Sequence, residues 1–289
     1  MEALLSVSFD NLSSYDQTKI RKGLRQVEGL LAQICLSPSS GNHHSVLEPK
    51  KEAAPPNKSL TELVHDPAFR EFFKLQDGFE WNVAIRLVNC LDRLLGKSHD
   101  GQNDLLIVQT LNLIQGSLML HPASRTLFSR ELHMNHLLDL LEPINCPAIQ
   151  SATIITLVCA LIDTPQNTRT FENLDGLLTS TSLFRSRETS REVKLKLVEF
   201  FYFYLMPETP SIPSAKNTNS LPELLQRSPS KLVSAFGHMD TNARKKLSSD
   251  GDFTKSTEEK QNLLGQYIHN VDDLVADLRE SAPFGGAII

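Results

Sequence analysis

Apolar residues recur at helical spacing along most of the chain, and no stretch shows the strict alternation of a half-buried strand. The pattern predicts a first helix over residues 13–35. It then predicts two helices hinged near Gly78, the second from about Phe79 to Leu95. Longer apolar helices are predicted at residues 105–120, 149–162 and 191–205, with shorter helices between them. We therefore expect an all-α protein.

Prolines follow the three most apolar helices at a nearly constant interval. Pro122, Pro165 and Pro207 lie 43 and 42 residues apart, and the segments after the first two share an Arg-Thr pair followed by a phenylalanine, Phe128 or Phe171. A period of about 40–47 residues is typical of armadillo and HEAT repeats. We predict an armadillo/HEAT-like helical repeat solenoid of three to four units, with these phenylalanines in the core between repeats. The alternative is coincidence within an irregular helical bundle.

Segments rich in Pro, Ser, Thr and Asn interrupt the helical pattern and suggest the domain organisation. Capping boxes at Ser59–Glu62 and Ser256–Glu259 mark where helices resume. We predict an N-terminal helical segment (1–36), a flexible linker (37–58), the repeat domain (59–206), a Pro/Ser-rich disordered segment (207–256) and a C-terminal amphipathic helix (257–282). The last helix has a narrow apolar stripe, so it is expected either to cap the solenoid or to lie in the groove of a partner.

Composition narrows the classes of partner. The net charge is -5 without large blocks, and there is no basic footprint of the kind that nucleic-acid binders show. The longest apolar stretch, Thr153–Ile162, is far shorter than the roughly 20 residues that span a bilayer. The N-terminus does not resemble a signal peptide. The four cysteines form no CxxC pair. We expect a cytoplasmic or nuclear protein with free thiols, no nucleic-acid partner and no membrane insertion.

The sequence carries no complete catalytic or cofactor motif. The GKS tripeptide at Gly96 lacks the upstream glycine of a phosphate-binding loop, and no cysteine has the downstream arginine of a tyrosine phosphatase. His133 and His136 are one helical turn apart, but no further metal ligand is placed near them, so they are expected at the surface or at a helix cap. We expect no catalytic residue, no cofactor and no metal. A hydrolase with scattered catalytic residues on a helical scaffold is the alternative.

Several features point instead to protein partners. Residues 105–165 contain six charged residues in 61, which fits either a doubly covered solenoid interior or an apolar surface covered by a partner. Trp81 is the only tryptophan and is either core or an interface anchor. The candidate partner-binding residues are Trp81, Arg86, Arg93, Arg125, Arg169, Leu264, Ile268 and Val271. For Arg125 and Arg169 the alternative is hydrogen bonding to helix-end carbonyls. Ser37 and Ser228, each followed by proline, are candidate phosphorylation sites.

Three stretches also resemble a known family. "FFKLQDGFEWNVAIRLVNCLDRLL", "LHPASRTLFSRELHMNHLLDLL" and the ending "LRESAPFGG" are similar to the fungal cell division control protein 14 family, a component of the septation initiation network distinct from the phosphatase of the same name. The resemblance covers roughly residues 61–207 and the last thirty. It implies a non-catalytic adaptor that binds a germinal-centre-type Ser/Thr kinase at the spindle pole body and promotes septum formation and cytokinesis. It does not identify the residues that contact the kinase.

Overall fold

The computed structural model describes residues 1–36, 57–96, 101–208, 254–268 and 271. The described residues form helices and no strand beyond an isolated bridge between Leu36 and Asn57, which confirms an all-α protein. None of these helices is long and apolar enough to cross a membrane. The helices are α1 (Glu2–Leu12), α2 (Gln17–Cys35), α3 (Leu60–His65), α4 (Pro67–Gln76), α5 (Val83–Leu95), α6 (Asp104–Leu120), the 3-10 helix η1 (Pro122–Ser129), α7 (Glu131–Asp139), α8 (Pro147–Leu161), α9 (Pro165–Asn173), α10 (Gly176–Arg185), α11 (Arg191–Leu205) and α13 (Thr257–Gly265).

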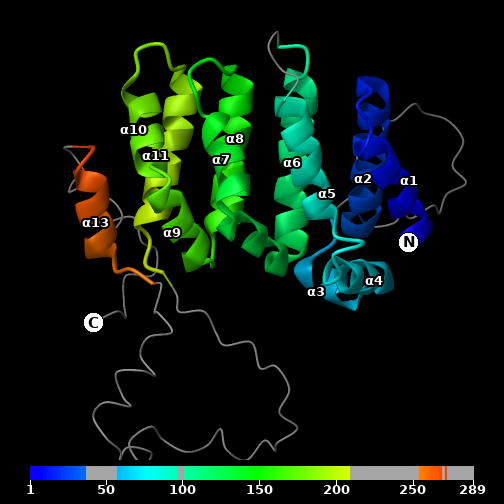
Figure 1. Ribbon diagram of the computed structural model, residues 1–289. Coiled ribbons are helices and arrows are strands. Elements are labelled where there is room, and N and C mark those ends of the chain that lie inside the picture. The colour runs from blue at the N-terminus through cyan, green and yellow to red at the C-terminus, as the bar shows by residue number, and fades with distance from the viewer. Residues whose placement is uncertain (37–56, 97–100, 209–253, 269–270, 272–289) are drawn as a thin grey trace, which may run out of the picture.

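The long helices stand side by side in a row, from α1 and α2 at one end to α10, α11 and α13 at the other (Figure 1). Helices α2, α6, α8 and α11 pack in succession and form one layer. Helices α1, α5, α7 and α10, with η1 and α9, pack against them and form a second layer. Because each long helix packs against a neighbour in its own layer and a partner in the other, the row has one continuous core.

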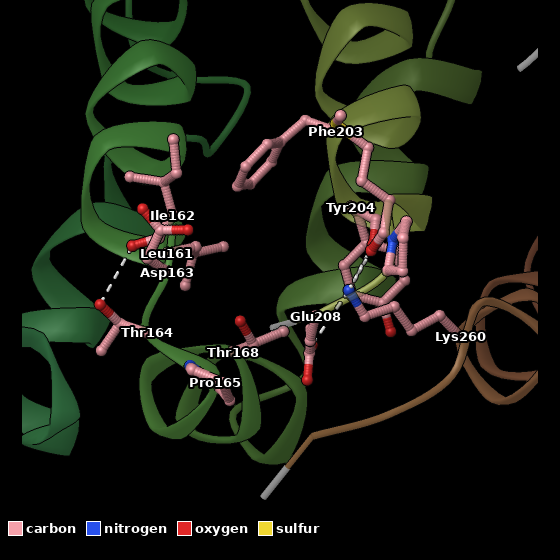
Figure 2. Close-up of a pocket in the computed structure, with 12 residues that line it drawn as sticks. Leu161, Ile162, Asp163, Thr164, Pro165, Thr168, Phe203, Tyr204, Glu208 and Lys260 are labelled. Atoms are coloured by element: carbon pink, nitrogen blue, oxygen red, sulfur yellow. Dashed lines mark hydrogen bonds and ion pairs between the residues drawn. The ribbon is translucent and has the colours of Figure 1, made fainter. Parts of the chain in front are cut away.

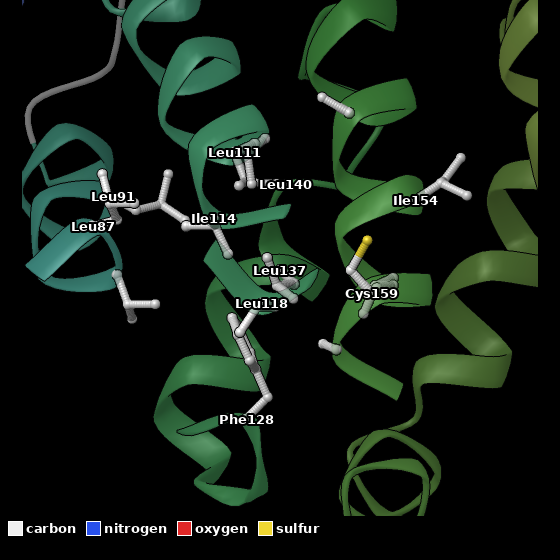
Figure 3. Close-up of a cluster of buried hydrophobic side chains, with 14 of the residues drawn as sticks. Leu87, Leu91, Leu111, Ile114, Leu118, Phe128, Leu137, Leu140, Ile154 and Cys159 are labelled. Carbon is white, nitrogen blue, oxygen red and sulfur yellow. The ribbon is translucent and has the colours of Figure 1, made fainter. Parts of the chain in front are cut away.

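The core lies between the two layers. Figure 3 shows leucines of α5, α6 and α7 meeting in this space, with Ile154 and Cys159 on α8 beside them. Phe128 and Phe171 are 1% and 0% exposed, so the prediction that both lie in the core is confirmed. The same cluster of buried apolar residues extends from Leu5 in α1 to Val271 at the other end of the row.

Prolines begin several of these helices. Pro67, Pro122, Pro147 and Pro165 each occupy the first helical turn. Proline suits this position because its missing N–H would have no intrahelical partner there. The two proline-led segments with related sequences, η1 and α9, pack against each other. The hydroxyl of Thr170 in α9 donates to the Ser129 carbonyl of η1 at 3.3 Å.

Helix boundaries agree with the sequence pattern to different degrees. Helix α11 has the predicted bounds, and both predicted capping boxes are present. The helix expected from Phe79 begins four residues later at Val83, because the Asn82 side chain caps it by accepting from the Ile85 N–H. Helix α1 was not predicted as a separate helix, because its apolar stripe is short and consists of Leu5, Phe9 and Leu12.

Candidate functional site

Two of the predicted partner-binding residues meet at the N-terminal end of the row. The ring of Trp81 stacks on that of Phe9 with centroids 6.3 Å apart. The Arg86 guanidinium lies 5.3 Å from the centroid of Phe9 and 5.9 Å from that of Phe79. Cation–π contacts of this kind hold α1 against α5. We call Phe9, Phe79, Trp81 and Arg86 the aromatic–arginine cluster. Its outermost member, Phe79, is 70% exposed.

Arg93 holds α1 at its C-terminal end. Its Nη2 donates to the carbonyl of Leu12, the last residue of α1, at 2.6 Å. A guanidinium at a helix C-terminus satisfies a carbonyl that lacks an intrahelical partner and interacts favourably with the helix dipole. Arg86 and Arg93, both on α5, therefore hold α1 at two points.

Arg169 belongs to a second group of polar residues at the opposite end of the row. Its Nη2 lies 2.6 Å from a carboxylate oxygen of Glu208 and 3.2 Å from one of Glu172. The Tyr204 hydroxyl donates to the same Glu172 oxygen at 2.7 Å. Both glutamate side chains are 8% exposed, so these interactions are sheltered from water.

Two lysines connect this group to the segment that contains α13. Lys260 Nζ lies 3.0 Å from Glu208 and donates to the carbonyls of Tyr204 and Met206, each at 2.8 Å. Lys255 Nζ lies 2.6 Å from Glu172. We call the whole group the polar junction; it consists of Arg169, Glu172, Tyr204, Glu208, Lys255 and Lys260. It joins three parts of the chain, α9, the end of α11 and α13.

Burial sets the electrostatics of the polar junction. Burial lowers the pKa of Lys260, and the salt bridge to Glu208 opposes this shift. Burial also raises the pKa of Tyr204, and its hydrogen bond to Glu172 adds to the effect. The Nε and Nη1 atoms of Arg169 are buried and have no hydrogen-bond partner among the described residues. Because an ion pair loses its hydration on burial, removing one partner from such a group is costly.

A cavity of about 220 Å³ opens beside the polar junction (Figure 2). Its wall is mostly apolar, and Phe203 of α11 projects into the space between α8 and α11. Glu208 and Lys260 lie at its edge. Asp163, which also lines the cavity, has a left-handed backbone with φ of 51°. The charged groups at the edge already pair with one another, so the cavity offers mainly apolar contacts.

The apolar stripe of the C-terminal segment turns toward the chain's own core. Leu264 and Val271 are 0% and 3% exposed, and Ile268 is half-buried against the same cluster. Helix α13 packs on α11. The C-terminal segment was expected either to cap the row of helices or to lie in the groove of a partner. Its described residues lie at the end of the row. Contact between these three residues and a partner stays a prediction.

Arg125 of η1 and Arg169 of α9 make different contacts, although their segments are related in sequence. Arg125 Nη1 donates to the carbonyl of Ile162, the residue after α8, at 3.1 Å and lies 3.6 Å from Asp163. The expected bond to a helix-end carbonyl is therefore confirmed for Arg125. Arg169 instead pairs with the carboxylates of Glu172 and Glu208.

Of the two positions predicted for His133 and His136, the surface position is wrong, whereas His133 contacts a carbonyl in the last turn of η1, as a cap-side histidine does. They are 6% and 8% exposed. His133 Nδ1 lies 2.8 Å from the Leu127 carbonyl, and His136 Nε2 lies 3.0 Å from Asp92 on α5. They are buried because α7 packs against η1 and also against α5, α8 and α9. The described residues contain no group of three or more His, Cys, Asp or Glu side chains that could hold a metal ion.

Ser124, His121 and Asp77 have the connectivity of a hydrolase triad. The Ser124 hydroxyl lies 2.8 Å from His121 Nδ1, and His121 Nε2 lies 3.1 Å from Asp77. Ser124 is 4% exposed, whereas the Asp77 side chain is 65% exposed. A hydrolase needs the opposite, an accessible serine and a sheltered carboxylate. The Ser124 hydroxyl also accepts from Asn82 Nδ2 at 2.9 Å. This group therefore joins the ends of α4, α5 and α6.

Ser37 and Ser228, the candidate phosphorylation sites, lie outside the described residues. Sequence reasoning missed most of the polar junction. One signal was present, since Lys260 lies one turn before Leu264 and so places a charge on the apolar stripe of its helix. Glu172 and Glu208 carried no such signal, because their burial depends on how three distant segments meet.

Over the described residues, the fold and the polar junction define an all-α protein of layered helices, in which buried ion pairs fasten α13. A family model described as "Cell division control protein 14, SIN component" matches residues 1–284, and the chain belongs to this family. SIN is the septation initiation network, so the family connects the chain with cell division. A similar protein is Cell division control protein 14 of Schizosaccharomyces pombe, 28% identical over 99% of this chain and 97% of the relative. No solved structure matches the chain.

Proposed function

We propose that the chain is a non-catalytic adaptor that binds a germinal-centre-type Ser/Thr kinase of the septation initiation network and promotes septum formation and cytokinesis. The family match over residues 1–284 is the observation that carries the proposal. A row of packed helices supports it, because such a row is stiff and offers extended surfaces to a protein partner. The spindle pole body as the place of action is part of the proposal.

The proposed architecture behind this function is an armadillo/HEAT-like repeat domain over residues 59–206, with the other segments as predicted from the sequence. A repeated polar contact supports it. Asn82 Nδ2 donates to the hydroxyl of Ser124, and Asn167 Nδ2 donates to the carbonyl of Arg125. Both contacts join residues that are 42 positions apart. Each asparagine also donates to a carbonyl near the end of an earlier helix, Gln76 or Ala160.

Of the predicted partner-binding residues, Trp81 and Arg86 are proposed to contact the kinase together with the rest of the aromatic–arginine cluster. Phe79 is 70% exposed and lies against Arg86, so an apolar group and a cation are available together. Trp and Arg are enriched at interface hot spots. The other predicted contact residues, and phosphorylation at Ser37 and Ser228, stay proposals. The reversed exposure of Ser124 and Asp77 argues against the hydrolase alternative.

Affinity purification from Schizosaccharomyces pombe cells tests the proposal. The tagged full-length chain is compared with the variants Phe79→Ala and Arg86→Ala and with the control Tyr15→Ala, which removes an exposed aromatic side chain between α1 and α2. We expect a germinal-centre-type kinase with the wild type and with the control, and less kinase with the two cluster variants. If the folded wild type recovers no such kinase, the adaptor proposal fails. If the cluster variants recover as much as the wild type, only the proposed contact fails.

A further inference from the structure

Helices α6 and α8 are unusually free of charge for helices at a surface. Asp104 is the only charged residue of α6, and α8 has none. A helix that is apolar on all sides is normally buried on all sides. Both helices nevertheless turn one side to solvent, where Met119 of α6 is 56% exposed and Ile155 of α8 is 39% exposed.

The exposed positions of the two helices form one surface. They recur at intervals of three, four or seven residues, which places them on one side of each helix. Between them, Gln115 of α6 donates to the Ala152 carbonyl and the Thr156 hydroxyl of α8, each at 3.0 Å, so the two helices are in direct contact. We call this surface the outer face. On α6 it consists of the exposed Leu105, Asn112 and Met119 and the half-buried Val108. On α8 it consists of the exposed Ala148 and Ile155 and the half-buried Ser151 and Val158.

A positively charged edge adjoins the outer face. Arg21, Lys22 and Arg25 of α2 are exposed, line a shallow hollow, and have no ion-pair partner among the described residues. Helix α2 packs beside α6, where Gln109 donates to Glu28 at 3.1 Å. An apolar surface and a row of unpaired cations therefore lie next to each other on the same layer.

We infer that the outer face and its positive edge bind an acidic amphipathic helix of a partner protein. The apolar side of that helix would lie on α6 and α8, and the acidic residues at one of its ends would meet α2. Neighbouring packed helices are about 8–10 Å apart, so the path from α2 to α8 is about 20 Å. A helix of about 13 residues has this length. The inference rests on the proposed adaptor function and adds the surface and the chemistry of the partner segment.

Charge complementarity selects this occupant over a second copy of the chain. A twofold pair built on the outer face would bring the α2 edge of one copy against either the α2 edge or the α11 edge of the other. The charged side chains of α11 are Arg191, Glu192, Lys194, Lys196 and Glu199, with a net positive charge. Two α2 edges repel each other, and the nearly balanced charges of α11 offer the α2 cations less than an acidic helix does.

Photo-cross-linking of the full-length chain in Schizosaccharomyces pombe cells tests the inference. A benzophenone amino acid replaces Asn112 on the outer face or, as the control, Leu178, which is 45% exposed on α10 in the other layer. Mass spectrometry then identifies the cross-linked peptide. We expect a peptide of another protein from position 112 only, with apolar residues at helical spacing and acidic residues at one end.

The charge of the edge is tested in the same cells. The double variant Arg21→Glu/Arg25→Glu should lower the cross-link yield about tenfold, because attraction becomes repulsion. The matched double variant Arg185→Glu/Arg187→Glu, also at exposed positions, should leave the yield unchanged. Circular dichroism confirms that both variants are folded.

A cross-link to a second copy or to another segment of the same chain, no cross-link, or an unchanged yield in the α2 variant would overturn the inference. A cross-linked acidic helix from a protein that is not a kinase would support the surface and count against the proposed kinase partner. Recovery of a kinase without any cross-link from position 112 would support the kinase partner and count against the proposed surface.

Discussion

At the scale of single residues, the least expected feature is a lysine buried where the last described helix meets the row. Lys260 is 3% exposed and is held by Glu208 and by two backbone carbonyls. Burial makes the charged form costly, and these three partners compensate for the lost water. Lys260 is therefore the residue on which the attachment of α13 depends most.

Lys260→Ala tests this dependence. The substitution leaves Glu208 with one buried partner fewer, so we expect the free energy of unfolding to fall by about 3 kcal/mol. The control is Lys196→Ala, which removes an exposed pair with Glu199 and should change the free energy by less than about 0.5 kcal/mol. Urea unfolding measures both values. Equal losses in the two variants would show that the polar junction does not fasten α13.

Cys90 gives a pH-dependent prediction. Burial raises the pKa of its thiol to about 11 from the ordinary 9.0. The folded chain keeps this proton at pH values where the unfolded chain loses it, so the stability that Cys90 contributes is complete below pH 9 and is lost as the pH rises to about 11. Between these values the free energy of unfolding should fall more steeply in the wild type than in Cys90→Ala. Parallel curves in urea titrations would contradict the assignment.

The sequence could predict residue roles where they depend on local chain geometry. Arg125 bonds a helix-end carbonyl, as its position after a proline-led turn suggested. Arg169 occupies the related position, yet it pairs with Glu208, which lies 39 residues away. Nothing near Arg169 in the sequence indicates that partner. Burial of His133 and His136 likewise depends on the packing of α7, which local spacing does not reveal.

At the scale of elements, the close packing of α1 on α2 depends on a glycine. A side chain at Gly23 would place its Cβ 2.9 Å from the Leu12 backbone nitrogen, closer than such atoms can approach. Gly29 lies two turns further along the same helix and has nothing within 4 Å of a Cβ. The two glycines therefore differ in their surroundings while sharing one helix.

This difference predicts opposite effects on stability. Gly23→Ala should lower the free energy of unfolding by about 1–3 kcal/mol, because α1 must shift away from α2. Gly29→Ala should raise it by up to about 1 kcal/mol, because alanine favours the helix. Thermal or urea unfolding of the two variants provides the measurement. Stabilisation by both substitutions would mean that α1 does not lie against α2 as described.

Elements with a clear apolar stripe could be predicted, and elements held by tertiary contacts could not. Helix α11 has apolar residues throughout, begins at a Ser190 cap and ends before Pro207, so both ends were marked in the sequence. Helix α1 contains Ser, Asp and Asn at positions that do not favour a helix. Its apolar side, with Leu5, Phe9 and Leu12, packs mainly on α2. Phe9 also meets Trp81 and Arg86, which are more than 70 residues away in the sequence.

At the scale of the whole molecule, two layers of helices give a stiff row with different chemistry along its length. The aromatic–arginine cluster lies at one end and the polar junction at the other, with the uncharged outer face between them. The helical spacing of apolar residues predicted the all-α fold, whereas the repeat units predicted from the proline interval stay a proposal. It could not predict which helix sides stay exposed, because low charge in α6 and α8 fits both a covered interior and an open surface.

The central claim is that this row of helices binds a kinase. Calorimetric titration of the full-length chain with a purified germinal-centre-type kinase of the septation initiation network tests the claim most directly. We predict saturable binding with a Kd of about 1 μM or tighter, equivalent to about 8 kcal/mol of binding free energy. Absence of binding at about 100 μM, with both proteins folded, would contradict the claim.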